Sequence, residues 1–168
     1  MLSANGLPYA GSVSKTLAPA LRLGWLVVPE RLTAELTAAK ALDDLGTPVV
    51  EQLALADFLE RGKLDRHLRR TRAVYRARRD ALVAALARHL PHCAPAVVPA
   101  GMHLVVRLPR AADERAVLER ARARGVALHG LSEHSLQARP AALLLGYGRI
   151  AQPAIEPGVR ELAAALSG

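Results

Sequence analysis

The stretch that decides the fold is Ser12-Val-Ser-Lys-Thr-Leu-Ala-Pro-Ala-Leu-Arg-Leu-Gly-Trp25, near the start of this 168-residue chain. Residues 9–13 are small and compatible with a strand, and residues 23–28 form a continuous apolar run that ends at Pro29. Such a run is typical of a strand that is buried on both faces. Lys15 and Arg22 therefore fall on a polar connection between two strands that we expect to be buried.

Lys15 is the most informative side chain of this connection. An amine must be neutral to attack an aldehyde, and partial burial near another cation favours the neutral form. Arg22 follows seven residues later, and its forked guanidinium suits a phosphate, as do the hydroxyls of Ser12 and Ser14. We expect Lys15 and Arg22 to share a half-buried cleft. Without further information, the same residues are also compatible with an ordinary surface loop.

The rest of the sequence predicts helices and strands in a definite order. Helices are expected over 30–44, 48–60 and 63–90, and the last of these carries its apolar residues on one face. Pro91 and Pro95 end this helix and mark a boundary. The expected elements beyond the boundary are strand-like residues 97–98, a strand over 103–108, a helix over 113–124, strands over 126–129 and 142–147, and a helix over 155–166.

Composition limits the classes of function. Hydrophobic residues make up 51% and charged residues 23%, which is the balance of a globular protein with a sizeable core. Aromatic residues are only 3%, which argues against a surface that stacks exposed bases. The single cysteine, Cys93, excludes an intrachain disulfide and a cysteine-rich zinc site. No apolar run reaches the roughly 18 residues of a membrane span, so we expect a cytoplasmic protein with no membrane partner.

The formal net charge of +8 is concentrated in one segment. Residues 61–80 hold nine lysines and arginines against two acidic residues. This basic helix could bind DNA phosphates, but a solvated helix face explains it as well. Elsewhere, His89-x-x-His92-Cys93 has a spacing found in metal sites, yet it crosses the helix end at Pro91 and lacks a second pair of ligands, so no metal site is predicted. We interpret His103, His129 and His134 as packed or surface histidines.

The segment from Ser12 to Trp25 resembles the lysine segment of fold-type-I pyridoxal-phosphate (PLP) aminotransferases of class I/II. The sequence is most similar to the aminotransferase-like domain of MocR-type regulators in the GntR family. Later pieces follow in the same order and at similar spacing, so the resemblance covers almost the whole chain. These pieces are His67-Leu68, Tyr75 through Arg79-Asp80, Gly101-Met-His103-Leu-Val-Val, Gly125-Val126 and Leu144-Leu-Gly146-Tyr147.

The resemblance implies a role for four residues. Lys15 would form the internal aldimine with PLP, and Arg22 would pair with the cofactor phosphate. Ser12 and Ser14 would donate hydroxyl hydrogen bonds to the cofactor. In a complete domain the lysine exchanges with an incoming amino compound while the cofactor ring takes up electrons.

Two departures from the family pattern matter. The acid that partners the pyridine nitrogen, the aromatic ring that stacks on the cofactor and a glycine-serine phosphate turn all precede the lysine in this family, and only fourteen residues precede Lys15 here. Many aminotransferases also place a substrate-binding arginine where this chain has Leu144. Arg139 and Arg149 are nearby but do not match that position. The second departure favours a ligand-sensing domain over amino-acid turnover.

The sequence therefore predicts an α/β protein, the C-terminal part of a PLP-dependent transferase fold. Residues 1–60 would belong to the large domain, 61–90 would form an interdomain helix, and 91–168 would form a small α+β domain. The main hypothesis is the PLP-binding portion of a MocR/GntR-type regulator, with a small amino-compound ligand. Its full-length form would be a homodimer that binds DNA through an N-terminal winged helix absent from this chain.

Two alternatives remain open at this point. The chain could be a fragment of a catalytic class I/II aminotransferase acting on a small amino acid, or a structural remnant without a cofactor. We expect the chain by itself to bind PLP weakly and not to transaminate, because the upstream contacts are missing.

Overall fold

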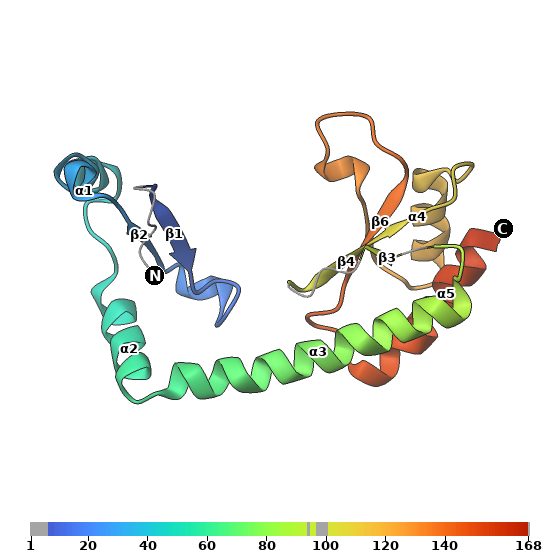
Figure 1. Cartoon of the computed structure of the whole chain (residues 1–168), viewed down its shortest axis with the longest axis horizontal. Coiled ribbons are helices and arrows are strands. Elements are labelled where there is room, and N and C mark those ends of the chain that lie inside the picture. Colours follow the sequence, from blue (N-terminus) through green and yellow to red (C-terminus); the bar gives the residue numbers. More distant parts are fainter. Residues whose placement is uncertain (1–6, 94, 97–100, 168) are drawn as a thin grey trace. The chain divides into compact units, whose positions relative to one another are not determined.

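The computed structural model describes residues 7–93, 95–96 and 101–167. The chain divides into two compact units between Arg69 and Arg70, inside the long helix α3 (Lys63–His89). Each unit has a sheet of its own, with two strands in the first unit and four in the second (Figure 1). Helices and strands are both present in each unit, so the α/β class is confirmed.

The first unit is built on an antiparallel hairpin. Strand β1 (Tyr9–Ser12) pairs with β2 (Gly24–Val27), in a register that joins Tyr9 to Val27 and Ser12 to Gly24. The connection between them contains a short 3-10 helix, η1 (Pro19–Leu21). Helices α1 (Glu30–Asp44) and α2 (Val49–Glu60) follow, as predicted to within one residue. Gly62, whose φ is 62°, turns the chain from α2 into α3, a backbone conformation that favours glycine.

The prediction that residues 23–28 form a strand buried on both faces is wrong. Strand β2 is present, but Trp25 is 46% exposed and Leu26 is 61% exposed. The physical reason is that the sheet has only two strands in the described part of this unit, and neither α1 nor α2 buries a residue against it. Among the described residues up to Arg69, the buried apolar side chains are Val13 and Leu23.

The second unit contains an antiparallel sheet of order β3-β4-β6-β5. The strands are β3 (Pro95–Ala96), β4 (His103–Arg107), β5 (His129–Gly130) and β6 (Ala142–Gly146). Helices α4 (Glu114–Ala123) and α5 (Gln152–Ser167) complete it, with a 3-10 turn, η2, over Ser132–His134. The strands predicted over 103–108 and 142–147 and both helices are confirmed. The strand predicted over 126–129 is wrong for residues 126–128, because β5 begins only at His129 and continues to Gly130. Residues 97–98 lie outside the described part.

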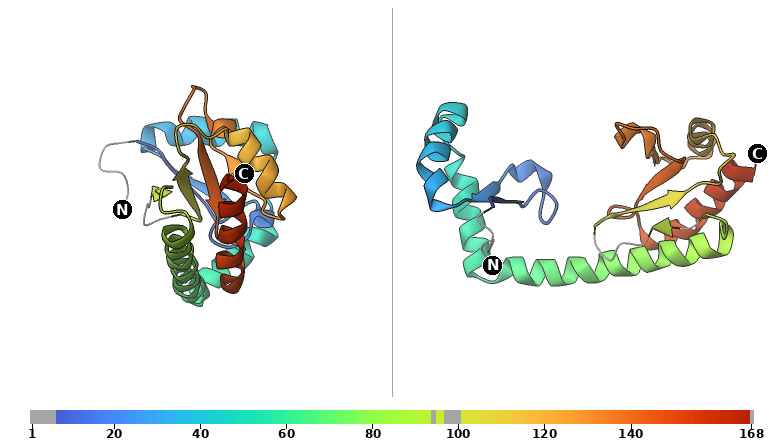
Figure 2. Two further views of the ribbon diagram at one scale, coloured as in Figure 1. Left: turned by 90° about the vertical axis from the view of Figure 1, so that its right-hand side faces the viewer. Right: turned by 45° about the horizontal axis from the view of Figure 1, so that its top comes forward.

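The core of the second unit lies between one face of this sheet and three helices. Leu104 and Val106 of β4 alternate with more exposed neighbours, as expected for a strand with one covered face. They pack with Leu143 of β6 and with the buried faces of α4, α5 and the last turns of α3, including the fully buried Leu86. Figure 2 shows β4 and β6 side by side, with α5 beside them. This core holds β4 and β6, and β5 is joined to it by its pairing with β6.

None of the described helices combines the length and the apolar character needed to cross a membrane.

Candidate functional site

The lysine segment closes the hairpin of the first unit. The ladder ends at the pair Ser12 and Gly24, and one further bond runs from the Val13 amide to the Leu23 carbonyl at 3.1 Å. The amides of Thr16 and Leu17 both donate to the Val13 carbonyl, at 3.1 and 2.8 Å, so the chain turns tightly around Lys15. Lys15 and Arg22 therefore emerge from one connection whose two ends are joined by the same ladder.

Arg22 occupies a special backbone position at the far end of this connection. It caps the η1 turn with φ of 50° and ψ of 25°, in the left-handed region that residues other than glycine rarely adopt. Its amide donates to the Pro19 carbonyl at 3.3 Å. This conformation fixes the direction in which the chain returns to β2, and with it the starting point of the Arg22 side chain.

The two serines are joined to the backbone of the connection. The Ser12 hydroxyl donates to the Leu23 carbonyl at 3.2 Å, and it accepts a hydrogen bond from the Ser14 amide at 3.1 Å. Ser12 therefore ties the two ends of the connection together and shapes the turn that carries Lys15. A ligand phosphate would have to replace the Leu23 carbonyl as the acceptor of the Ser12 hydroxyl.

The expected half-burial of Lys15 and Arg22 is wrong for this chain, because both side chains are exposed to solvent. The connection has Val13 and Leu23 buried at its base, but the described residues of this unit provide no second wall above it. The sequence placed both cations on the connection correctly. Their burial depends on neighbouring structure that a local pattern does not specify.

One contact with the lysine segment was not predicted. His67, in the first turns of α3, places Nε2 3.0 Å from the Thr16 carbonyl oxygen, and it donates there when that nitrogen carries the proton. Thr16 is the residue next to Lys15, so α3 supports the turn from one side. His67 belonged to the family-like pieces of the sequence, but nothing in its local pattern pointed to this partner.

A groove of about 910 Å³ lies beside the hairpin, between β1, β2 and α1. Trp25 lies over its strand partner Gly11 so closely that an added Cβ at Gly11 would fall 2.3 Å from the indole ring. Lys40 and Asp43 of α1 are the charged residues on the groove wall. Lys15 and Arg22 do not line it, so the groove and the lysine connection are separate features.

In the second unit, Leu144 lies in the middle of β6, paired with Val105 of β4 and with His129 of β5. An apolar side chain stands at the position where an arginine would be expected for a substrate carboxylate. Arg139 and Arg149 are both exposed and lie outside the strand. The structure therefore brings no arginine to this position on β6.

Glu114 anchors the loop that follows β5. Its carboxylate accepts hydrogen bonds from the Ser132 hydroxyl, from the Ser132 amide at 3.2 Å and from the Ala142 amide at 3.0 Å. Burial raises the pKa of Glu114, but these hydrogen bonds together outweigh burial, so the pKa lies below its ordinary value. The anionic carboxylate is the form that holds the loop.

Three side chains on this loop were not predicted as a group. His129, Glu133 and His134 each offer one metal-ligating atom, and these atoms lie within 4.8 Å of one another. The signal in the sequence is the spacing His-x-x-x-Glu-His, whose histidines, from the sequence alone, we interpret as packed or surface residues. Burial raises the pKa of the Cys93 thiol.

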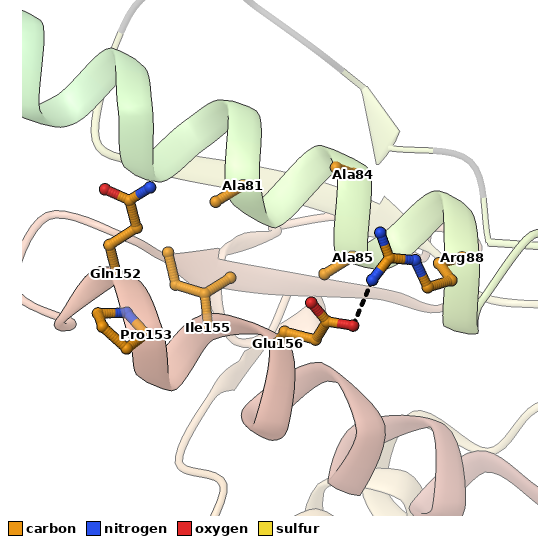
Figure 3. A pocket seen from close by; sticks show the side chains of 8 residues that line it. All are labelled: Ala81, Ala84, Ala85, Arg88, Gln152, Pro153, Ile155 and Glu156. Carbon is orange, nitrogen blue, oxygen red and sulfur yellow. Dashed lines mark hydrogen bonds and ion pairs between the residues drawn. The ribbon is translucent and has the colours of Figure 1, made fainter.

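A hollow of about 410 Å³ lies between α3 and α5 (Figure 3). Ala81, Ala84 and Ala85 form its α3 wall, and an ion pair between Arg88 and Glu156, 2.5 Å long, crosses one end. Arg78, which belongs to the basic segment of residues 61–80, donates a hydrogen bond to the Gly148 carbonyl at 2.6 Å. We therefore interpret the hollow as a gap between two packed helices that an ion pair crosses at one end.

Comparison with known proteins relates the chain to two groups. No family model matches it. It is 32% identical over 164 residues to YhdI, an HTH-type transcriptional regulator of Bacillus subtilis, and 33% identical over 160 residues to MocR, a probable rhizopine catabolism regulatory protein of Rhizobium meliloti. These matches include 96% and 94% of this chain but 35% and 32% of the relatives. The chain thus spans about a third of their length.

Its structure is also similar to kynurenine aminotransferase of Pyrococcus horikoshii, crystallised with PMP, kynurenine and kynurenic acid. The TM-score is 0.90 and the identity 29%, over 98% of this chain and 41% of the other. The shared region is the C-terminal part of the aminotransferase chain.

Proposed function

Because the chain is a C-terminal portion of the fold-type-I PLP aminotransferase fold, we propose that it is the cofactor-binding part of a MocR/GntR-type transcriptional regulator. The observation that carries this proposal is the hairpin connection with Lys15, Arg22 and Ser12, in a chain that two regulators match over nearly its full length. In this proposal residues 1–60 belong to the large domain, 61–90 form the interdomain helix, and 91–168 form the small domain.

The residues of the connection fit the cofactor chemically. The phosphate of PLP needs a guanidinium and hydroxyl donors, and its aldehyde needs an amine. Arg22, Ser12, Ser14 and Lys15 supply these groups from one connection closed by the pair Ser12 and Gly24. Lys15 would bond to the cofactor, Arg22 would neutralise its phosphate, and the serine hydroxyls would orient it. The bound cofactor would supply a conjugated ring that takes up electrons.

Leu144 supports the regulator over the enzyme. A buried arginine that meets a substrate carboxylate in a two-point contact is a strong source of amino-acid specificity. Leucine at this position on β6 provides no charge, so an amino compound would be held mainly through its amine at Lys15. Sensing of a small amino compound needs only reversible binding there. Binding of DNA through a winged helix and pairing of two subunits are parts of this proposal for the whole protein.

A catalytic aminotransferase is the second candidate, and one observation favours it. The structural match to kynurenine aminotransferase includes 98% of this chain, and the connection that carries Lys15 belongs to this chain's first unit. The two candidates differ in the DNA upstream of this coding sequence. A reading frame for a winged helix supports the regulator, and a frame that encodes only the rest of a cofactor domain supports the enzyme.

The direct test of the site is covalent trapping of the cofactor. The chain is incubated with PLP, reduced with borohydride and digested, and the modified lysine is identified by mass spectrometry. We expect absorbance near about 420 nm before reduction and the label on Lys15 after it. Lys15→Arg should abolish both signals, and Lys63→Arg, which removes an amine elsewhere at constant charge, should leave them unchanged. Equal labelling of Lys63 and Lys15 would contradict the proposal.

The role of Arg22 is separated from general binding by comparing two ligands. Arg22→Gln should weaken binding of PLP by at least about tenfold, because a charge-assisted contact to phosphate contributes about 1.5–3 kcal/mol. Binding of pyridoxal, which has the aldehyde but no phosphate, should change little. An equal loss for both ligands would mean that Arg22 acts through the fold of the connection.

A further inference from the structure

The second unit holds a cluster that the proposed function does not use. We propose that His129, Glu133 and His134 form a binding site for a divalent transition metal ion of the zinc class. All three side chains are exposed and lie on β5 and the turn that follows it. The inference stands independently of Lys15 and of any cofactor there.

The distances between the ligating atoms suit a small metal ion. One atom from each residue lies within 4.8 Å of the others, and Nδ1 of His129 is 3.2 Å from Oε2 of Glu133. A tetrahedral zinc ion with bonds of about 2.0–2.1 Å separates its ligand atoms by about 3.3 Å. One pair therefore already has the required spacing. The ligating atom of His134 lies within 4.8 Å of the other two, so the His134 side chain would have to move closer to complete the set.

The chemistry of the three ligands selects the class of metal. Two imidazoles and one carboxylate form a set that zinc uses in open sites, where a water or a small anion takes the fourth position. Magnesium and calcium prefer sites made of oxygen atoms alone, so two histidines disfavour them. His134 also lines a hollow of about 450 Å³ together with Ser135 and Arg139, so a fourth ligand bound near His134 would have space on that side.

The backbone beneath the three side chains is held on several sides. β5 pairs with β6 through His129 and Gly130, and the Leu131 amide donates to the Ala142 carbonyl at 2.8 Å. The His134 amide donates back to the Leu131 carbonyl at 3.1 Å, and Glu114 holds Ser132 between the two histidines. The metal would thus bind to ligands on a prearranged backbone, and only exposed side chains lose freedom on binding.

Titration of the metal-free 168-residue chain with Zn²⁺ tests the inference. Calorimetry should show one ion bound per chain, and the ring resonances of His129 and His134 should shift together in NMR spectra. His129→Ala and His134→Ala should each weaken binding by at least about tenfold, and Glu133→Gln should also weaken it. The matched control is His92→Ala, which removes another exposed histidine of the same unit and should have no effect.

Three results would overturn the inference. These are no binding of Zn²⁺ at micromolar concentration, unchanged binding in the double variant of His129 and His134, and an equal loss in His92→Ala. The ring resonances of the unmodified chain decide the question even if a variant loses its fold, because they report the ligands directly. Co²⁺ gives a further readout, since a four-coordinate site with nitrogen ligands should produce intense visible absorption and a merely electrostatic contact should not.

Discussion

The two units of this chain bury their apolar residues to very different extents. In the second unit, buried side chains from β4, β6, α3, α4 and α5 form one continuous core. In the described part of the first unit, burial is confined to Val13 and Leu23, and neither α1 nor α2 has a buried residue. Leu42, in the last turn of α1, is 83% exposed, and Leu45, the residue after α1, is 92% exposed.

The difference shows which unit can be stable by itself. Burial of apolar surface stabilises a fold by roughly 25 cal/mol per Å². The second unit has this stabilisation because three helices and a sheet bury apolar side chains against one another. The first unit relies mainly on a short ladder and on two helices of 15 and 12 residues, and isolated helices of about this length are marginal in water without packing. Lys15 therefore lies in the less stable unit, and binding of a ligand there would include the cost of ordering it.

The largest effect should come from the core of the second unit. Leu86→Ala removes a fully buried side chain and should lower the free energy of unfolding of this unit by about 2–5 kcal/mol. Leu53→Ala makes the same change on α2, where the side chain is 66% exposed, and should change stability by less than about 0.5 kcal/mol.

The two units can be followed separately during urea unfolding. Trp25 is the only tryptophan and lies in β2, so its fluorescence reports the first unit. Ring resonances of the buried Tyr147 report the second. We expect the Trp25 signal to change at lower urea, and Leu86→Ala to shift only the Tyr147 transition. A single transition for both signals would show that the units unfold together and would break the comparison.

A smaller effect is expected where β5 meets α4. A Cβ added at Gly130 would lie 2.1 Å from Oε1 of Glu114 and 2.7 Å from its Cδ. Gly130→Ala must therefore displace the carboxylate that holds Ser132 and Ala142, at a cost of about 1–3 kcal/mol. Gly158→Ala is the control, because its Cβ would meet open space within α5 and alanine is the better helix former. Similar stability changes in the two variants would contradict the role of Glu114.

The sequence predicted the positions of helices and strands better than it predicted which side chains are buried. The apolar face of residues 63–90 located α3 closely, because a period of 3.6 residues is a local property. Residues 23–28 showed the apolar run of a buried strand, and the strand formed, but its covering layer is a tertiary property that no local run contains. For the same reason Lys15 and Arg22 were placed on the correct connection and given the wrong exposure.

The candidate sites show the same limit. The lysine segment could be recognised because its residues are adjacent in sequence, whereas the contact of His67 with Thr16 joins residues 51 positions apart. Glu114 and Ser132, 18 positions apart, meet only because α4 packs beside β5 and β6. The group of His129, Glu133 and His134 is nearly contiguous. It went unpredicted because the spacing alone does not fix the turn that brings the rings together.

Acid should weaken the second unit through Glu114. Its folded-state pKa lies below the ordinary 4.5, so the folded unit binds this proton less readily than the unfolded chain. The stabilisation is fully present above about pH 4.5 and is lost as the pH falls through the folded pKa. Urea unfolding followed by Tyr147 should show this loss, and Glu114→Gln should make the acid dependence shallower. A slope unchanged by Glu114→Gln would assign the loss to other carboxylates.

The smallest effect is expected from the ion pair of Arg88 and Glu156, which joins α3 to α5 at the protein surface. Their side chains are 62% and 49% exposed, and exposed pairs contribute about 0–1 kcal/mol because water and salt screen them. Arg88→Ala should therefore shift the Tyr147 transition far less than Leu86→Ala, although both residues lie on the same helix. Raising the salt concentration should remove the difference in stability between Arg88→Ala and the unmodified chain. A loss comparable to that of Leu86→Ala would mean that charge pairing between helices, and not the apolar core, distinguishes the second unit from the first.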